Sequence, residues 1–310
     1  MSPLIDSPAL TLRDPTSLPA ASVGLELLVI GLAAVTLVHA VRAQRRGTDR
    51  AALLTWITIA IYGLVMELVS YNFIQNFAHG DFTLSFYDRQ LPLYITVIYP
   101  VLLYTGIATA RRLGLPRHAE AIASGLFIVA MDAPFDVVGP VAGWWRWFDT
   151  DPNIAFRWYG VPVTSYYWHF TFGSTLALLT AWIGQRARRP DGPSPWLALP
   201  LGVATMLVGF LCFVPFHLAK TAGVSDGIIV ATALIAGAAV VLRVPRRLAP
   251  ERDRLLTAIW LAFYGYHVVV AIALAAGGGV DWIGRAAFVT AVAAVAILVR
   301  RPGWYTAAAS

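Results

Sequence analysis

The chain has few charged residues and almost no cysteine. Only 13% of its 310 residues are Asp, Glu, Lys or Arg, and 58% are hydrophobic, whereas about 25% of a typical soluble domain is charged. The single cysteine, Cys212, excludes a disulfide or a cysteine-based metal site within one chain. The sequence also lacks a P-loop, a dinucleotide fingerprint, a GxSxG motif and a haem-attachment motif. These absences argue against a soluble enzyme and against coupling to ATP.

Long apolar runs recur along the whole chain instead. They predict an all-α fold, a polytopic helical bundle of the membrane with about nine transmembrane helices. The predicted spans cover residues 20–43, 51–75, 91–110, 119–141, 160–184, 196–217, 225–243, 255–276 and 283–300.

Basic residues alternate between the loops. Seventeen of the 23 follow the first, third, fifth, seventh and ninth predicted spans, so the positive-inside rule places these loops in the cytoplasm. We therefore expect an extracytoplasmic N-terminal segment (1–19), a single integral membrane domain (20–301) and a cytoplasmic C-terminal tail (302–310). The net charge of +6 comes from these loops. It indicates contact with anionic membrane lipids and not with nucleic acid. We expect a multi-pass protein of the cell membrane, namely the plasma membrane of a bacterium.

Four acids lie within the predicted spans: Glu26, Glu67, Asp132 and Asp136. A charged side chain at the bilayer centre costs about 2.5–3.5 kcal/mol even on lenient scales, so such residues face the bundle interior and are functional candidates. Asp132 and Asp136 are four residues apart and share one face of a helix. Glu26 lies near the end of its span and can reach the interface.

Polar side chains concentrate in the outer halves of five spans, and we expect them to meet there. The site-bearing part is predicted to be residues 60–175, whereas 196–301 reads mainly as scaffold. The candidate catalytic residues are Asp132, Glu67 and Asp136. The candidate substrate-binding residues are Tyr71, Asn72, Trp144, Trp145, Trp147, Tyr159, Tyr166, His169, Tyr266 and His267.

Both groups also have a structural interpretation. The acids could simply bond to Tyr, Asn or His on neighbouring helices. The tryptophans after Asp136 could stabilise a cation with their ring faces, or they could form the aromatic belt that is normal at a membrane interface.

Other site types find less support in the residues. His79, His169, His217 and His267 could bind a metal together with the acids, but no HxxxH or HxxE spacing joins them, so we expect no metal. Lys220 is the only lysine and lies near a helix end, which disfavours a retinal-type Schiff base.

The stretch 63–173 resembles a known family in several short motifs. They comprise Glu67 in an early span, Asp132 and Asp136 in a later one, Gly143, Trp145 and Trp147 after it, and Tyr159, Gly160 and Pro162 opening the next. In this respect the chain resembles the carotenoid-biosynthesis hydratases of bacterial and archaeal membranes, whose chemistry is related to that of small integral-membrane terpene cyclases. Two positions depart from the family pattern: Val137 follows Asp136 where Pro is usual, and Thr164-Ser165-Tyr166 replaces an Asn.

The resemblance implies a hydrophobic isoprenoid lipid substrate and an enzyme that protonates an alkene or epoxide. Asp132 or Glu67 would donate the proton, and the products would arise by hydration (a lyase) or cyclisation (an isomerase), without a cofactor. Two alternatives use the same residues: a proton-coupled transporter, and a lipid- or pigment-binding membrane protein without catalysis.

Overall fold

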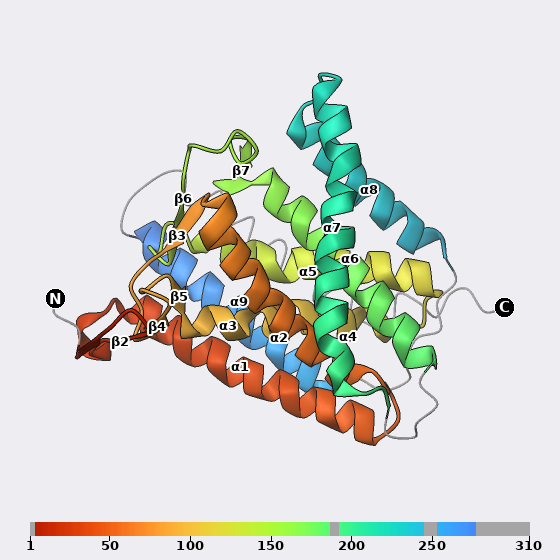
Figure 1. Ribbon diagram of the computed structural model, residues 1–310, viewed down its shortest axis with the longest axis horizontal. Helices are drawn as coiled ribbons and strands as arrows, with labels where there is room; N and C mark the ends of the chain where they lie inside the picture. Colours follow the sequence, from red (N-terminus) through yellow and green to blue (C-terminus); the bar gives the residue numbers. More distant parts are fainter. Residues whose placement is uncertain (1–3, 187–191, 245–252, 277–310) are drawn as a thin grey trace.

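The protein folds as a bundle of long helices with short strands at one end (Figure 1). The computed structural model describes residues 4–186, 192–244 and 253–276. The long helices are α1 (Ala20–Arg45), α2 (Ala52–Val69), α5 (Arg117–Val138), α6 (Val163–Arg186), α7 (Ala198–Thr221), α8 (Asp226–Arg243) and α9 (Arg254–Ala276). The shorter ones are α3 (Leu93–Tyr99) and α4 (Thr105–Arg111), with 3-10 turns at Pro15–Ser17 and Pro195–Leu197.

Among the described residues, seven helices are long and apolar enough to cross a membrane. This confirms a polytopic helical membrane protein, whereas the count of nine spans and the orientation remain predictions. The predicted fifth span is a helix, α6, but it is not one of the seven. Polar side chains such as Tyr166, His169 and Thr171 interrupt its apolar sequence. The predicted span 283–300 lies outside the described residues.

Two of the spans contain a π-helical turn. α2 continues into such a turn at Ser70–Ile74, and Pro100–Tyr104 joins α3 to α4 in the same way. A π turn accommodates an extra residue and changes which side chains face the bundle, and such turns are frequent at functional sites. Both π turns therefore indicate where a functional site could lie.

Partly buried ion pairs gather several of the basic loops at one end of the bundle. Arg111 at the end of α4 binds Asp49 in the α1–α2 loop (2.5 Å) and approaches Glu120 near the start of α5 (3.7 Å). Asp253, just before α9, binds His39 of α1 (2.8 Å). The loops that the charge pattern assigns to one side therefore do meet in space.

Short antiparallel strands occupy the opposite end, so the bundle is mostly helical but carries small sheets that the sequence did not predict. The loops predicted at residues 76–90 and 142–159 are partly β-structure. One sheet has the order β1 (Ile5–Asp6), β2 (Leu10–Leu12), β4 (Leu84–Phe86), β5 (Leu91–Pro92), and the two others pair β3 (Phe77–His79) with β6 (Trp145–Trp147) and β7 (Arg157–Trp158) with β8 (Val161–Pro162). Phe77 lies opposite Trp147 and His79 opposite Trp145, so β3 and β6 align the two predicted loops.

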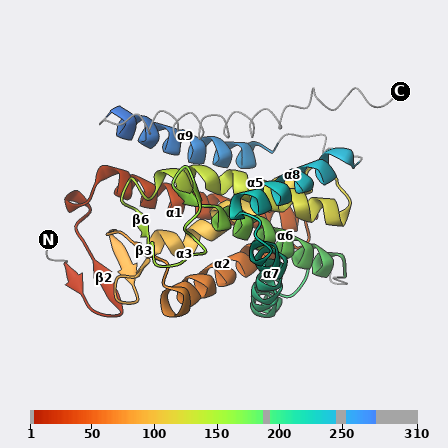
Figure 2. The same ribbon diagram turned by 90° about the horizontal axis from the view of Figure 1, so that it is seen from above.

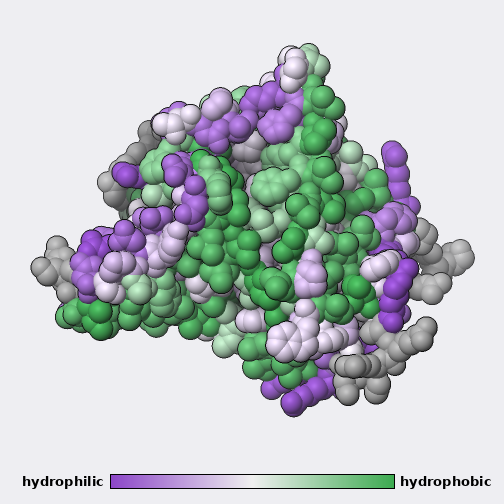
Figure 3. All heavy atoms as spheres, viewed as in Figure 1, coloured by the Kyte–Doolittle hydropathy of each residue, from purple (hydrophilic) through white to green (hydrophobic). Residues whose placement is uncertain are grey.

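The helices form layers around α5, which packs most extensively on α6. Seen from above, α9 covers one side of the bundle, and α2 and α7 lie on the other (Figure 2). Apolar side chains cover much of the visible face, while hydrophilic ones gather toward its edges (Figure 3). Large apolar side chains of α7 are exposed, among them Leu207, Leu211 and Leu218. An exposed apolar helix of this kind suits contact with hydrocarbon.

Candidate functional site

A cluster of two acids and one histidine lies between α5 and α6. Asp132 and Asp136 are one turn apart on α5, and both are buried. On α6, the Ser165 hydroxyl donates to Asp136 Oδ2 (2.6 Å), and His169 Nδ1 lies 3.4 Å from Asp132 Oδ2. The i,i+4 spacing predicted the shared face of the aspartates, and α6 supplies the groups that face them.

The tautomer of His169 follows from its backbone contact. Its Nδ1 lies 2.9 Å from the Ser165 carbonyl oxygen, which can only accept, so Nδ1 carries the proton. Because this N–H is directed at the carbonyl, the 3.4 Å approach to Asp132 is an electrostatic contact and not a hydrogen bond. Asp132 Oδ2 accordingly has no hydrogen-bond partner among the described residues.

Glu67 on α2 belongs to a second polar group. The Tyr99 hydroxyl donates to Glu67 Oε1 (2.6 Å), and His79 Nε2 from β3 lies 3.5 Å from Oε2. The Tyr94 hydroxyl lies 3.4 Å from His79 Nδ1. Glu67 lies one turn before the π turn of α2, and Tyr99 directly precedes that of the α3–α4 segment, so both π turns adjoin this group.

One small cavity, of about 100 Å³, joins the two groups. Its polar lining consists of Glu67, His79, Tyr99, Asp132, Asp136, Ser165 and His169, and its apolar lining includes Phe77, Phe135, Trp145 and Trp147. Neither Arg nor Lys of the described chain lines it. The structure therefore brings the three predicted catalytic acids together in one cavity with aromatic walls.

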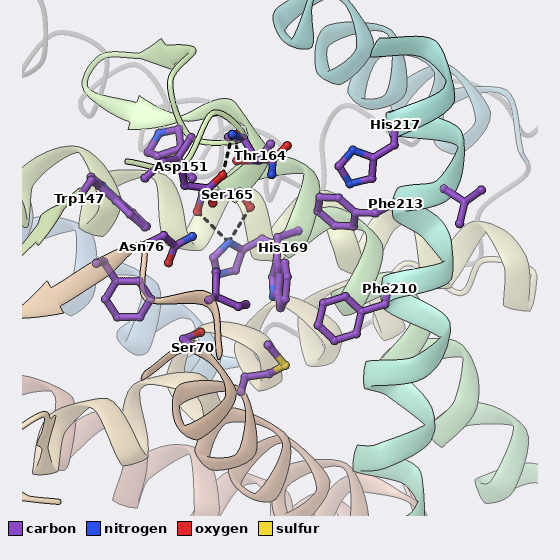
Figure 4. A pocket seen from close by; sticks show the side chains of 18 of the residues that line it. Ser70, Asn76, Trp147, Asp151, Thr164, Ser165, His169, Phe210, Phe213 and His217 are labelled. Carbon is purple, nitrogen blue, oxygen red and sulfur yellow. Dashed lines mark hydrogen bonds between the residues drawn. The ribbon is translucent and has the colours of Figure 1, made fainter. Parts of the chain in front are cut away.

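A larger cavity of about 360 Å³ adjoins the small one and shares Phe77, Tyr99, Trp147, Ser165 and His169 with it. It extends from the β3–β6 pair to α7 (Figure 4). From α7 it is lined by Phe210, Phe213, Val214 and His217. Within residues 196–301, which are predicted to be mainly scaffold, α7 therefore supplies aromatic side chains to one wall of this cavity.

Three of the predicted substrate-binding residues line these cavities: Trp145 the smaller one, and Trp147 and His169 both. Trp144, Tyr266 and His267 do not. They form an aromatic cluster behind Phe135 of the small cavity's wall. In this cluster Trp144 stacks on Tyr266 (6.2 Å between centroids) and packs edge-on against His267 (5.7 Å). His267 Nδ1 bonds to the Phe263 carbonyl (2.7 Å), which gives this cluster a packing role.

The other four predicted binding residues also lie outside both cavities. Tyr71 packs edge-on against the ring of His79 (6.0 Å) and so supports the site from behind. Asn72 is exposed, and its amide accepts a hydrogen bond from Tyr87 (2.7 Å). Tyr159 is 48% exposed in a left-handed turn, and Tyr166 is buried against Trp158. Their place in the chain predicted the correct end of the bundle but not the direction of each side chain.

Several cavity residues were not among the predicted site residues. The sequence indicates His79 only as a possible metal ligand and does not single out Tyr99 or Ser165, although Ser165 lies in a motif that departs from the family pattern. The fourth intramembrane acid, Glu26, accepts a hydrogen bond from the Thr83 backbone N–H (3.0 Å) and does not line either cavity. Its role here is to tie α1 to the loop before β4.

Asp132, Asp136 and His169 also fulfil the geometric requirement of a metal site. Each offers one ligand atom, and these atoms lie within 4.8 Å of one another. Carboxylate and imidazole ligands of this kind suit Zn²⁺, Mn²⁺ or Fe²⁺. The sequence raises His169 with the acids as a possible metal site but shows no ligand spacing, because the histidine comes from the neighbouring helix, 33 residues after Asp136.

The model of a family described as a domain of unknown function (DUF7802) matches residues 12–185, more than half of the chain. The protein therefore belongs to this family. No curated protein and no solved structure matches the chain. Every residue that lines the small cavity lies within the matched segment, whereas α7 lies outside it.

Proposed function

We propose that this protein is an integral-membrane enzyme that protonates a double bond, or an epoxide, of an isoprenoid-like lipid and so promotes its hydration or cyclisation. The observation that carries the proposal is the small cavity, in which three carboxyl groups meet aromatic walls with no Lys or Arg in the described lining. Burial away from water and counterions favours the neutral, proton-donating form of a carboxyl group. Such an acid can act on a base as weak as an alkene when the substrate is held against it.

Asp132 is the proposed proton donor. Its Oδ2 has no hydrogen-bond partner among the described residues, so this oxygen is available to carry the proton. Asp136, held by Ser165, and Glu67, held by Tyr99, are the proposed acceptors. Each is already oriented by a hydroxyl donor, as suits a group that receives a proton.

The proton balance closes without a cofactor. Asp132 transfers its proton to one alkene carbon, and the other carbon becomes a cation facing Trp145, Trp147 and Phe135. In hydration, water bonds to the cation and its surplus proton passes to Asp136 or Glu67. In cyclisation, a second double bond of the substrate captures the cation, and a C–H next to the new cation gives its proton to Asp136 or Glu67. Transfer between the carboxyl groups then restores Asp132.

The substrate would enter from the membrane through the larger cavity. That cavity reaches α7, whose Phe210 and Val214 are 39% and 50% exposed. We further propose that the strand-bearing end lies outside the cell and the Arg-rich end in the cytoplasm, with the N-terminus outside, because the positive-inside rule favours this orientation.

The test compares wild type, Asp132→Asn and the control Asp88→Asn, which alters an exposed loop acid away from both cavities. Each is expressed in a host that makes acyclic carotenoids and prenyl lipids, and lipid extracts are analysed by chromatography and mass spectrometry. A product one water heavier indicates hydration, and one of equal mass but altered retention indicates cyclisation. The proposal expects that product from wild type and Asp88→Asn but not from Asp132→Asn. An undiminished product from folded Asp132→Asn would refute the assigned role.

Metal-assisted chemistry is a second candidate, favoured by the ligand geometry of Asp132, Asp136 and His169. A cation there would keep both aspartates ionised, could activate a water, and would leave Glu67 as the acid. Elemental analysis of purified wild type and His169→Ala separates the two candidates. About one bound equivalent of metal in wild type, lost in the variant, favours the metal mechanism. Metal-free protein that retains activity after chelation favours the carboxyl mechanism.

The transporter and binding-protein alternatives predict no new lipid product in any host. A transporter would instead move its ligand across vesicle membranes, and Asp132→Asn would stop that movement. A binding protein would retain its ligand in the Asp132→Asn variant.

A further inference from the structure

Two buried polar atoms in the larger cavity have no hydrogen-bond partner among the described residues. The indole Nε1 of Trp147 is a donor, and the side-chain Oδ1 of Asn76 is an acceptor, and neither forms a hydrogen bond within the described residues. Both side chains line the cavity. They lie beside each other at its strand end (Figure 4), where the Phe148 N–H donates to the Asn76 carbonyl (2.9 Å) and β3 pairs with β6.

A buried polar atom that lacks a hydrogen-bond partner destabilises the protein. A group that both donates and accepts would satisfy the two atoms at once. A hydroxyl group does this, because its oxygen can accept from the indole N–H while its hydrogen is donated to the amide oxygen. An ether or a carbonyl oxygen could accept from Trp147 but could not donate to Asn76, and a hydrocarbon could do neither.

The rest of the larger cavity has a different character. Met66 and Trp168 also line it, and α7 contributes Phe210, Phe213 and Val214 together with one polar residue, His217. Because Phe210 and Val214 are also partly exposed on the surface of α7, the apolar part of the cavity leads to the face that suits hydrocarbon. The cavity therefore has one end for a hydroxyl group and one for an apolar chain.

We propose that the substrate is a lipid alcohol, bound with its hydroxyl between Trp147 and Asn76 and its chain directed toward α7. This proposal rests on the proposed function in one respect: it takes the alcohol bound in the larger cavity to be the substrate of the enzyme. Trp147 lines both cavities, so the hydroxyl is held at their junction. The double bond that reaches Asp132 is then one close to the hydroxyl end of the chain and not one at the far end.

Binding to purified protein in the Asp132→Asn background tests this, because that variant binds without turning over and Asp132 does not line the larger cavity. Three probes share one carbon skeleton: farnesol, its methyl ether and the hydrocarbon that lacks the oxygen. We expect farnesol to bind about tenfold more tightly than the ether, which corresponds to one hydrogen bond of about 1.4 kcal/mol. The hydrocarbon should bind more weakly still.

Trp147→Phe keeps an aromatic ring but removes the donor, and Asn76→Leu removes the acceptor at similar size. In Trp147→Phe the advantage of the ether over the hydrocarbon should disappear. In Asn76→Leu the advantage of farnesol over the ether should disappear. Trp182→Phe, on the exposed surface of α6, should keep both ratios.

Equal affinities of Asp132→Asn for the three probes would overturn the proposal, as would unchanged ratios in both folded variants. Either result would leave the acid chemistry of Asp132 standing, because lipid products in the expression host report on that chemistry separately. Conversely, a hydroxyl preference without any lipid product would retain the alcohol site and exclude the proposed reaction.

Discussion

Asp132 and His169 approach to 3.4 Å across the α5–α6 interface, yet the imidazole N–H is donated to the backbone of Ser165 and not to the carboxyl group. Asp132 lines the small cavity, and one of its oxygens therefore has no hydrogen-bond donor within the described part of the chain. Asp136, one turn away, receives the Ser165 hydroxyl at 2.6 Å. Two acids on one helix face thus have unequal surroundings, as proton donors and acceptors in enzymes do.

Ser165→Ala tests the orientation of Asp136. Loss of a hydrogen bond to a charged group costs about 1.5–3 kcal/mol, so we expect turnover to fall about 10- to 100-fold with little change in folding. Initial rates of lipid product formation measure this. The control is Ser174→Ala, on the same helix but outside both cavities. Equal rates for wild type and Ser165→Ala would show that this bond does not serve the reaction.

Tyr99→Phe tests Glu67 in the same assay. The change removes the hydroxyl that donates to Glu67 Oε1 at 2.6 Å and leaves the ring in place, so we expect a loss of about 10-fold or more in kcat. Tyr87→Phe, in the exposed loop, removes a hydroxyl that binds only Asn72 and should leave kcat unchanged. If both variants were as active as wild type, Glu67 would have no part in the chemistry.

Gly139→Ala should destabilise the protein and displace a cavity wall. A Cβ atom at Gly139 would lie 2.0 Å from the ring of Trp145, and overpacking of this kind costs about 1–3 kcal/mol. Thermal unfolding of the purified protein gives the effect as a lower Tm. At Gly31 a Cβ atom would meet nothing within 4 Å, and Gly31→Ala in the middle of α1 should keep or raise the Tm. A Gly139→Ala variant with unchanged Tm would contradict the close packing on Trp145.

Asp253 should make the free energy of unfolding depend on pH in the acid range. Burial favours its neutral form, but the hydrogen bond from His39 and the backbone N–H of Leu256 outweigh burial and lower its pKa to about 2. A lowered folded-state pKa stabilises the protein above the unfolded value of about 3.9, and this contribution disappears as pH falls from about 4 toward 2. The shift corresponds to on the order of 2 kcal/mol.

Unfolding free energies of wild type and Asp253→Asn, measured between pH 2 and 6, test this contribution. The variant should be less stable near pH 6, and the difference should shrink as the pH falls. The matched control is Asp88→Asn, because Asp88 is exposed and lies outside the ion pairs at this end. A constant difference across this range would mean that Asp253 acts through packing alone.

The sequence predicted the helices well because their physical signal is local. Eight of the predicted spans lie within the described residues. Each of them is a helix whose ends agree with the prediction to within a few residues. The i,i+4 spacing likewise placed Asp132 and Asp136 on one face. By contrast, strands of two or three residues such as β3 and β6 carry little local signal, and their pairing depends on a partner more than 60 residues away.

Depth along a helix did not determine which way a side chain points. Tyr266 and His267 were predicted at the level of the site, but α9 directs them into a cluster with Trp144. Phe210 and Phe213 were overlooked because an apolar residue in an apolar helix has no distinguishing neighbour in the sequence. Only the packing of α7 beside α6 reveals that they border a cavity.

The π turn at Ser70–Ile74 has a consequence for the length of α2. A regular helix advances by about 100° per residue, so removing one residue from this turn would swing everything after it by roughly that angle. Phe73 is 82% exposed and makes little contact of its own. A chain that lacked only Phe73 could therefore retain every helix, and β3 and His79 would still turn away from Glu67. In this π turn the number of residues, more than their identity, determines whether His79 faces Glu67.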